Sequence, residues 1–363
     1  MKIENIELFP LEIENTEPFK IATGTSLKTE NVVVKVECDG KIGWGNGAAN
    51  GVTDETNGSM MDCLLNYKDK LIGKDIDIKN IWKDFKKTNP KDPSALAGLD
   101  IALHDLKGKL TGNSVFQLYD GKESGVITDR TIGIMDKKET IDHAEDYIDQ
   151  GFKALKIKVG LEMEKDIERI GAVRKTVGED IKIWVDANQG YSVDESKTFC
   201  EKIRKYDIEF VEQPVAEKDL EGLKEVTEST ELPIVADEAM KDHENAEKIC
   251  SEEIADMVNI KLMKCGGITG GRKIIEVIED YGVDAMVGCM LEMESSLGAA
   301  VHLYNTSDNV KYADLDGHFL IPGELSKGLK FIDGELTTKK TPGLGVEVVE
   351  KELNKYLETV QKS

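Results

Sequence analysis

From about residue 126 onward, short apolar segments alternate with longer amphipathic segments rich in charge. Apolar runs of this length, bounded by turn residues, are typical of buried strands, and the segments between them have helical length. Eight parallel units favour a closed (β/α)₈ barrel over a doubly wound open sheet, because the glycine fingerprint of the open sheet is missing. The candidate strands are ITDRTIGI, ALKIKVG, IKIWVDAN, FVEQPV, PIVADEA, MVNIKLM, DAMVGCM and KYADLDG.

The N-terminal third has a different pattern. Residues 2–16 and 31–45 predict antiparallel strands, and the second segment contains the hairpin signal Asp39-Gly40. The polar, glycine-containing segments 22–31 and 46–58 are expected to be mobile loops.

Residues 92–113 predict a helix, with Asp92 as cap, Pro93 in the first turn, Gly112 at the end and leucines along one face. We predict an α/β protein with two domains. An α+β capping domain covers residues 1–122 and is completed by the C-terminal tail, residues 326–363, and a (β/α)₈ catalytic barrel covers residues 123–325.

Composition narrows the class of protein. The chain has 363 residues, which favours two domains, and a net charge of −23, which argues against nucleic acid or an anionic membrane as a partner. The first 17 residues lack the apolar run of a signal peptide, and no stretch approaches the roughly 18 apolar residues of a membrane span. The six scattered cysteines predict reduced thiols. We expect a soluble, cytoplasmic homo-oligomer.

Five of the predicted strands end in a charged residue, at steps of 28, 26, 25 and 24 residues: Lys158, Asp186, Glu212, Asp237 and Lys261. Parallel strands are buried on both faces and are expected to be almost wholly apolar. The carboxyl ends of barrel strands are where active sites are built. The series therefore predicts a site with three carboxylates and a lysine on each flank.

Asp186, Glu212 and Asp237 end three consecutive strands, which lie about 4.8 Å apart, so their carboxylates should converge. A hard divalent cation such as Mg²⁺ would relieve the repulsion among them, and the five histidines show no zinc-binding spacing. The alternative is three separate surface salt bridges. Asn188 is expected to support the ligands. Glu238 should face the other side by strand alternation, in a supporting or structural role.

Lys156 and Lys158 lie two residues apart and share one face of strand two. Strand six lies opposite strand two in an eight-stranded barrel, so Lys158 and Lys261 should face each other across the mouth. Such a pair can remove an α-proton from one face of a carbon acid and return one to the other. The metal and Lys156 would lower the pKa of Lys158. Alternatively, both lysines of strand two stabilise neighbouring carboxylates.

Strand eight ends in Asp314-Leu315-Asp316, whose two carboxylates share a face opposite the metal site. They are suited to bind a substrate ammonium, although an Asp-x-Asp-Gly turn is the alternative because Gly317 follows. The glycine-rich segment 265–273 departs from the phosphate-binding loop, since Arg272 stands where that motif requires Lys-Ser/Thr.

Together these motifs resemble the enolase superfamily, in its muconate cycloisomerase subgroup. The resemblance covers nearly the whole chain and includes the K-x-K of strand two, AGLDIALHDLKGKLTGN, WVDANQGY, FVEQPV, ADEA and NIKLMKCGGIT. Strand seven lacks the histidine of mandelate-racemase-like members, which disfavours that branch.

The resemblance implies a capping domain over a modified TIM barrel. It implies Mg²⁺ on Asp186, Glu212 and Asp237, with acid/base lysines at Lys158 and Lys261. This superfamily is a known example of such a base acting with Mg²⁺ on an ene-diolate.

Within the subgroup, Asp314 and Asp316 resemble the Asp-x-Asp of dipeptide epimerases, where the pair holds the substrate's α-ammonium. Thr131 matches a position that lines the family's pocket. We expect both Thr131 and Lys156 to be substrate-binding residues. Relatives that act on Ala-Glu often have an arginine in the segment corresponding to residues 22–31. This segment has no arginine, and its cations are Lys28 and, just before it, Lys20.

The implied activity is Mg²⁺-dependent epimerisation of the C-terminal residue of an L,L-dipeptide, with L-Ala-L-Glu to L-Ala-D-Glu favoured, by proton transfer between two lysines. The alternatives are an o-succinylbenzoate synthase, an N-acylamino-acid racemase, a muconate-type cycloisomerase, or a non-catalytic metal-binding or scaffold protein on the same fold.

Overall fold

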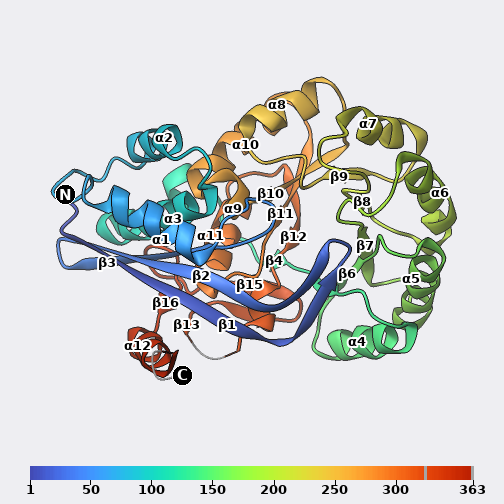
Figure 1. Ribbon diagram of the computed structural model, residues 1–363, viewed down its shortest axis with the longest axis horizontal. Helices are drawn as coiled ribbons and strands as arrows, with labels where there is room; N and C mark the ends of the chain where they lie inside the picture. The colour runs from blue at the N-terminus through green and yellow to red at the C-terminus, as the bar shows by residue number, and fades with distance from the viewer. Residues whose placement is uncertain (323–324, 361–363) are drawn as a thin grey trace.

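The computed structural model describes residues 1–322 and 325–360 of the chain. Eight parallel strands form one sheet in sequence order and curve into a barrel (Figure 1). This order confirms the predicted modified (β/α)₈ barrel, because a doubly wound sheet reverses its strand order. The strands are β5 (Arg130–Ile132), β6 (Ala154–Lys158), β7 (Lys182–Asp186), β8 (Val211–Glu212), β9 (Ile234–Ala236), β10 (Met257–Lys261), β11 (Asp284–Gly288) and β12 (Val310–Asp314).

Amphipathic helices cover the outside of the barrel and join consecutive strands. In the described part of the chain, β12 is followed by the short 3₁₀ turn η3 (Gly317–Leu320) rather than by an eighth such helix. The covering helices are α4 (Lys137–Asp149), α5 (Met163–Val177), α6 (Val193–Ile203) with the 3₁₀ turn η2 (Arg204–Tyr206), α7 (Leu220–Ser229), α8 (His243–Ser251), α10 (Ile268–Tyr281) and α11 (Glu294–Tyr304). A short, wholly buried helix, α9 (Leu262–Cys265), lies between β10 and α10.

The barrel interior near the start of the strands is filled by apolar side chains. Inward-pointing side chains near the start of the strands pack together, and Trp184 stacks on Phe210 with ring centroids 5.1 Å apart. The fully buried members are Ala154, Trp184, Phe210, Val235 and Met286, with Met257 and Tyr312 at their edge. Polar side chains of the same strands are thereby confined to the carboxyl ends.

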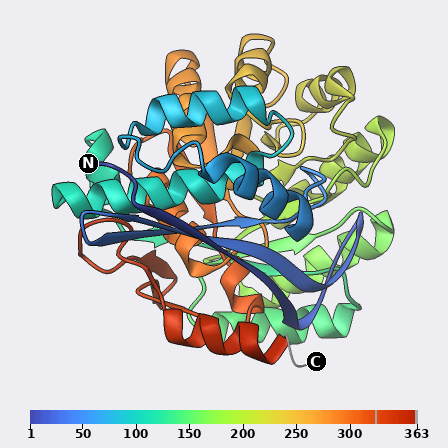
Figure 2. The ribbon, with the colours of Figure 1, turned by 60° about the vertical axis from the view of Figure 1, so that its left-hand side comes forward.

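The N-terminal domain is built on an antiparallel sheet, β1 (Asn5–Ile21), β2 (Gly24–Cys38) and β3 (Lys41–Ala48). Its helices are α1 (Asn57–Lys68), α2 (Ile78–Thr88) and α3 (Pro93–Thr111), followed by the 3₁₀ turn η1 (Val115–Tyr119). Figure 2 shows these helices on one face of the sheet and the C-terminal helix α12 (Glu350–Val360) on the other.

The prediction of a mobile loop over residues 22–31 was wrong. These residues begin β2, which pairs with β1 through Ile21 and Gly24 around a two-residue turn. Polar composition marked the segment as exposed, but cross-strand pairing satisfies its backbone groups. The second expected loop, 46–58, is also shorter than predicted, because β3 continues to Ala48 and α1 begins at Asn57.

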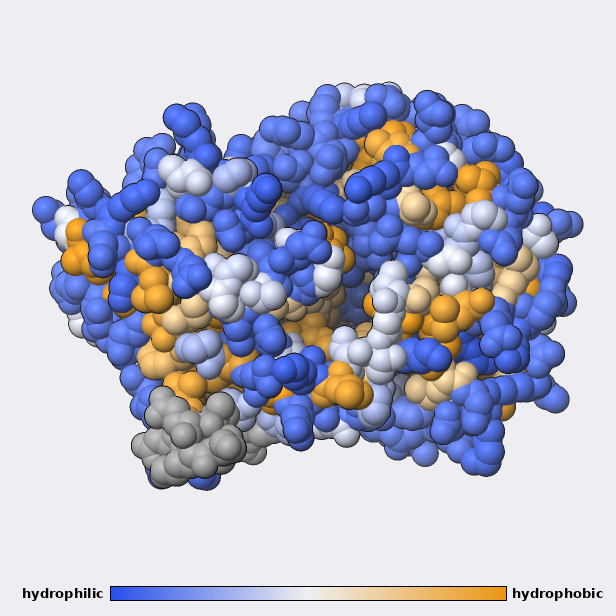
Figure 3. All heavy atoms as spheres, in the orientation of Figure 1, coloured by the Kyte–Doolittle hydropathy of each residue, from blue (hydrophilic) through white to orange (hydrophobic). Residues whose placement is uncertain are grey.

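The tip of the β1–β2 hairpin reaches the barrel beside the ends of β5 and β6. Ile134 N donates a hydrogen bond to Lys20 O at 2.8 Å, and a Cβ on Gly160 would lie 3.1 Å from the Ala22 Cβ. In the space-filling view, a hollow opens next to this tip, between the two domains (Figure 3). The hairpin therefore forms part of the rim of the barrel mouth.

Helix α3 packs very closely on β3 because both surfaces have small residues. A Cβ on Gly43, Gly45 or Gly47 would lie 2.1–2.4 Å from backbone oxygens of α3. These glycines alternate along the strand and so share one face. The opposite side of α3 meets the barrel, where Asp100 accepts hydrogen bonds from Thr269 N and Oγ1 at 3.0 and 2.6 Å. The predicted helix is thus buried on more than one face.

Asp92 occupies the N-cap position of α3 but makes no side-chain cap hydrogen bond, so the predicted cap was wrong. Glu55, from the segment before α1, takes this role. Its carboxylate oxygens accept hydrogen bonds from Ser94 N at 2.8 Å and Ala95 N at 3.0 Å. The cap is supplied from about 40 residues away, which a local sequence signal does not reveal. The end at Gly112 is confirmed, in the left-handed conformation.

Replacing Glu55 by alanine is expected to lower the free energy of unfolding by about 1–3 kcal/mol, because two buried N–H groups lose their acceptor. Urea denaturation should show a lower midpoint with an unchanged slope. Glu145→Ala, at an exposed position of α4, is the matched control. Equal midpoints for the two variants would contradict the role of Glu55.

The tail contacts both domains. Leu353 of α12 packs with Leu11 and Ile13, and Lys35 pairs with Glu350 at 2.9 Å, as predicted for packing on the N-terminal domain. The strand β14 (Lys330–Ile332) pairs with β15 (Glu335–Thr337), and β15 pairs in turn with β4 (Val126–Ile127), just before the first barrel strand. A further pair, β13 (Ser326–Lys327) and β16 (Glu347–Val348), precedes α12.

No helix among the described residues is both long and apolar enough to cross a membrane.

Candidate active site

The charged residues predicted from strand ends meet at the carboxyl end of the barrel. Lys158, Asp186, Glu212 and Lys261 are the last residues of β6, β7, β8 and β10, and Asp237 directly follows β9. Lys158 is paired in register with Asp186, and Asp186 with Glu212. One ligand oxygen from each of the three carboxylates lies within 4.8 Å of the others, and all three side chains are buried. Three surface salt bridges are therefore excluded.

A lysine contacts each end of this row of acids. Lys158 Nζ lies 2.7 Å from Asp186 Oδ2, and Lys261 Nζ lies 2.8 Å from Asp237 Oδ2. Glu212 stands between the two aspartates on the middle strand. Asp237 raises the pKa of Lys261 above its ordinary value, although burial alone would lower it.

Lys156 lies at the centre of the site, below Lys158 on the same face of β6. Its ammonium is 2.6 Å from Glu212 Oε2, 2.7 Å from Asp314 Oδ2 and 3.0 Å from Asp186 Oδ2, with no exposure to solvent. Burial alone would lower the pKa of Lys156, but these carboxylates raise it well above its usual range. This arrangement favours stabilisation of neighbouring acids over direct contact with substrate.

The pKa values of the three acids shift in different directions. Burial opposes ionisation of all three. Lys156 and Lys158 nevertheless lower the pKa of Asp186 to about 2, and Lys261 and Lys264 lower that of Asp237. Burial and repulsion by Asp186 raise the pKa of Glu212 to about 8. Ionisation of the middle carboxylate, Glu212, is thus the least favoured of the three.

Asn188 is placed as predicted, whereas Glu238 is not. Asn188 Nδ2 donates to Asp186 Oδ2 at 3.3 Å and to Glu238 Oε1 at 3.1 Å, which brings Glu238 to the same side as the acids. The alternation that predicted the opposite orientation does not apply, because β9 ends at Ala236 and Glu238 lies in a turn. Burial and the charges of Asp237 and Asp186 raise the pKa of Glu238 to about 7.

Two residues of the segment NIKLMK contact the acids but were not predicted from the sequence. Asn259 Nδ2 donates to Glu212 Oε1 at 2.7 Å, and Lys264 Nζ lies 2.5 Å from Asp237 Oδ1. Asn259 is two residues before Lys261 on one strand, so alternation could have placed it on the same face. Lys264 lies in the turn of helix α9, where no such rule applies.

Asp314 ends β12 and Asp316 follows it, and both are held by cations. Lys156 contacts Asp314, while Arg130 Nη1 lies 3.0 Å from Asp316 Oδ2. Thr131 contributes its backbone N–H, which donates to the same Asp316 oxygen at 2.7 Å. Burial would raise the pKa of Asp314, but Lys156 and the two flanking lysines lower it. Arg130 was missed, although an arginine inside a predicted buried strand was a visible signal.

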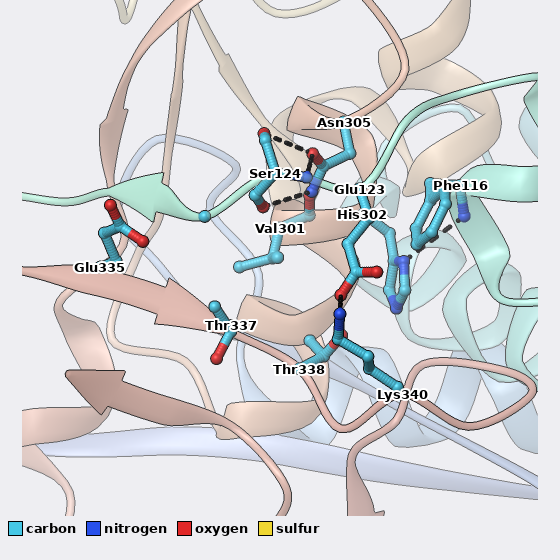
Figure 4. A pocket seen from close by; sticks show the side chains of 11 residues that line it. Phe116, Glu123, Ser124, Val301, His302, Asn305, Glu335, Thr337, Thr338 and Lys340 are labelled. Atoms are coloured by element: carbon cyan, nitrogen blue, oxygen red, sulfur yellow. Dashed lines mark hydrogen bonds and ion pairs between the residues drawn. The ribbon is translucent and has the colours of Figure 1, made fainter.

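A second cavity, of about 290 Å³, lies near the opposite end of the barrel (Figure 4). It is formed by the segment before β4, the last turns of α11 and the tail. Its polar groups pair among themselves, as in the ion pair of Lys340 with Glu123 at 3.1 Å and the hydrogen bond from Ser124 N to Asn305 Oδ1 at 2.7 Å. It lacks the converging acids and lysines of the carboxyl end, so we assign the chemistry to the latter.

The capped barrel and its row of three acids between two lysines define an enzyme class: barrel enzymes with an acidic, metal-type site under a second domain. Residues 139–352 match the family model described as enolase C-terminal domain-like, and residues 5–119 match that of the mandelate racemase / muconate lactonizing enzyme N-terminal domain. The chain therefore belongs to the mandelate racemase/muconate lactonizing enzyme family, as its motifs predicted.

Similar proteins include dipeptide epimerases. A hydrophobic dipeptide epimerase of Enterococcus faecalis is 37% identical over 88% of this chain and 91% of that protein. An L-Ala-D/L-Glu epimerase of Clostridium acetobutylicum is 36% identical over 96% of this chain and 99% of that protein. The solved structure of a dipeptide epimerase from Enterococcus faecalis with Mg and L-Leu-L-Tyr has a TM-score of 0.92 at 35% identity, covering 96% of this chain and all of that one.

Proposed function

We propose that this protein is a Mg²⁺-dependent dipeptide epimerase that inverts the α-carbon of the C-terminal residue. The observation that carries the proposal is the row of Asp186, Glu212 and Asp237 with Lys158 at one end and Lys261 at the other. The dipeptide epimerases among its relatives support it. Epimerases are isomerases, and this chain shares their fold over nearly its whole length.

The donor set fits a hard divalent cation. Three buried carboxylates offer oxygens within 4.8 Å of one another, and Mg²⁺ prefers a few carboxylates together with water and substrate oxygens. Burial and then repulsion by Asp186 raise the pKa of Glu212, and a bound cation would offset both. When bound, Mg²⁺ would neutralise the substrate carboxylate and the charge that develops as the α-proton leaves.

The two lysines exchange the α-proton. A lysine ion-paired with an aspartate cannot accept a proton, so Lys158 and Lys261 must leave Asp186 and Asp237 to act. Once neutral, one lysine takes the α-proton from its side, while the other, still protonated, returns a proton from the opposite side. Because they contact opposite ends of the acid row, the two bases attack opposite faces of the α-carbon.

Asp314 and Asp316 would bind the substrate's free α-ammonium. Each has one carboxylate oxygen in contact with a protein cation, so each is fixed in orientation. A substrate held by its carboxylate at the acid row and by its ammonium at this pair needs both charged groups, as a dipeptide with a free N-terminus has. Acyl substrates lack this ammonium, which disfavours an N-acylamino-acid racemase or an o-succinylbenzoate synthase.

Asp314→Asn tests this assignment. A hydrogen bond to a charged group contributes roughly 1.5–3 kcal/mol, so we expect kcat/KM for a free dipeptide to fall about 10- to 100-fold. Asp308→Asn, outside the site in the loop before β12, is the control, and thermal unfolding checks that the variant is folded. An Asp314→Asn enzyme with unchanged kcat/KM on dipeptides, or one that turns over N-acylamino acids as well as the wild type does, would contradict the proposal.

We propose L-Ala-L-Glu as the substrate. The relatives include epimerases named for L-Ala-D/L-Glu, for hydrophobic dipeptides and for L-Lys-D/L-Arg. The tip of the rim hairpin has Lys20 and Lys28 as its cations, which suits an anionic side chain. Lys28 pairs with Glu12 at 2.7 Å, which leaves Lys20, next to the end of β5, as the residue suited to the glutamate side chain.

We further propose a cytoplasmic homo-oligomer whose domains divide at residues 122/123 and 325/326. The six cysteines, all buried and free, support the reducing compartment.

A further inference from the structure

Asp129 is a buried acid beside the proposed ammonium site. It lies just before β5, where the chain closes the barrel against β12. Asp129 N donates a hydrogen bond to Ala313 O at 3.3 Å, and Leu315 N donates to Thr128 Oγ1 at 2.9 Å. The Asp129 side chain has no exposure to solvent, and neither of its oxygens accepts a hydrogen bond from any described residue.

An ionised Asp129 would be unfavourable at this position. A buried carboxylate without donors loses its hydration and gains nothing in return. Two further acids, Asp314 and Asp316, face it, and both would repel a third negative charge. The charge of Lys156 favours ionisation, but its ammonium already contacts three other carboxylates. Burial first, then the two aspartates, raise the pKa of Asp129 well above its usual range.

A neutral carboxylic acid has one O–H donor. The backbone hydrogen bond from Asp129 N to Ala313 O places Asp129 beside Asp314, whose carboxylate can accept that hydrogen bond. We propose that Asp129 is a neutral acid that donates a hydrogen bond to Asp314 and thereby positions Asp314 for the substrate ammonium. This inference rests on the proposed function, since it assigns Asp314 to the ammonium.

The hydrogen bond completes a symmetrical support for the ammonium site. Arg130 and the Thr131 N–H hold Asp316 from behind. Lys156 and Asp129 hold Asp314 in the same way, one as a cation and one as a neutral donor. Because Asp129 adds no charge, the site presents two anions and not three to the substrate. Asp129 is accordingly a positioning residue and does not contact substrate.

Infrared spectroscopy tests directly whether the Asp129 carboxyl group is protonated. With Mg²⁺ present and substrate absent, the spectrum of the wild type minus that of Asp129→Asn at pH 7 should contain the carbonyl stretch of one protonated carboxylic acid. Glu292→Gln is the control, because Glu292 is also buried at the mouth and burial raises its pKa to about 7. Its band should fade as the pH rises through neutrality, while the Asp129 band persists. A difference spectrum without a protonated acid would overturn the proposal.

Steady-state kinetics tests whether Asp129 positions Asp314 for the substrate. Asp129→Asn keeps a neutral donor of the same shape, so KM for the dipeptide should stay within a few-fold of the wild type. Asp129→Leu removes the donor, so KM should rise about tenfold or more with a smaller change in kcat. A loss in Asp129→Asn as large as in Asp314→Asn would mean that Asp129 acts as an anion, and the proposal would fail. If the wild type turns over no dipeptide, the proposed function fails, and the infrared result still decides the state of Asp129.

Discussion

Lys158→Ala is expected to abolish epimerisation in both directions while one epimer of the substrate still exchanges its α-proton with solvent. Epimerisation needs a base on one face of the α-carbon and an acid on the other, so the loss of either lysine stops the net reaction. A positioned acid or base contributes about 10²- to 10⁴-fold, and the rate should fall by at least this factor. The remaining lysine, Lys261, can still remove and return a proton on its own face.

Lys261→Ala should give the mirror result, with exchange confined to the other epimer. Each variant is incubated in D₂O with each purified epimer, and loss of the α-proton signal is followed by NMR. Lys175→Ala, at an exposed position of α5, is the matched control. Retained epimerisation in either variant, or exchange of the same epimer in both, would contradict the two-base arrangement.

Glu212→Gln should abolish activity by removing the middle carboxylate of the acid row. We expect the Mg²⁺ affinity to fall by about 100-fold or more, because changes merely adjacent to metal ligands already cost 10- to 100-fold. Isothermal titration calorimetry measures this without any turnover. The fold should survive, since a glutamine Oε1 still accepts the hydrogen bond of Asn259. Glu209→Gln, at the other end of the same segment, is the control and should bind Mg²⁺ normally.

The Glu212→Gln variant should also change how thermal stability depends on pH when no metal is bound. Without metal, burial and repulsion raise the pKa of Glu212 to about 8, above its value of about 4.3 in an unfolded chain. A raised pKa in an acid means that its contribution to stability is present below the unfolded value and is lost as the pH rises through about 8. In a chelator, the melting temperature of the wild type should therefore fall from pH 4.5 to 8, and less so in Glu212→Gln. If the melting temperature changed with pH equally in the wild type and in Glu212→Gln, the raised pKa of Glu212 would be contradicted.

The elements predicted well from sequence are those set by periodicity. Parallel strands are buried on both faces, so Lys158, Asp186 and Glu212 stood out as charges in apolar segments, and their spacing indicated the barrel. The position of Asn188 followed from the same reasoning. These predictions needed only the alternation of side chains and the common direction of the strands.

The failures concern interactions that local sequence does not encode. Glu55 caps a helix across about 40 residues, and the turn after β9 reverses the expected orientation of Glu238. The segment 22–31 looked like a loop because its residues are polar, yet its pairing with β1 makes it a strand. The central position of Lys156 among three acids depends on strands that meet only in the closed barrel. Asp129 was visible as an acid in a predicted strand, but its neighbours were not.

The central claim is that the row of acids and the two lysines exchange the α-proton of a dipeptide's C-terminal residue. Incubation of L-Ala-L-Glu and a panel of hydrophobic and cationic dipeptides in D₂O with Mg²⁺, followed by proton NMR, measures this directly. We expect the α-proton of the C-terminal residue alone to be lost from at least one dipeptide, together with the appearance of its diastereomer, and both should stop when Mg²⁺ is chelated. Absence of exchange in every dipeptide, or exchange at the N-terminal residue, would contradict the account.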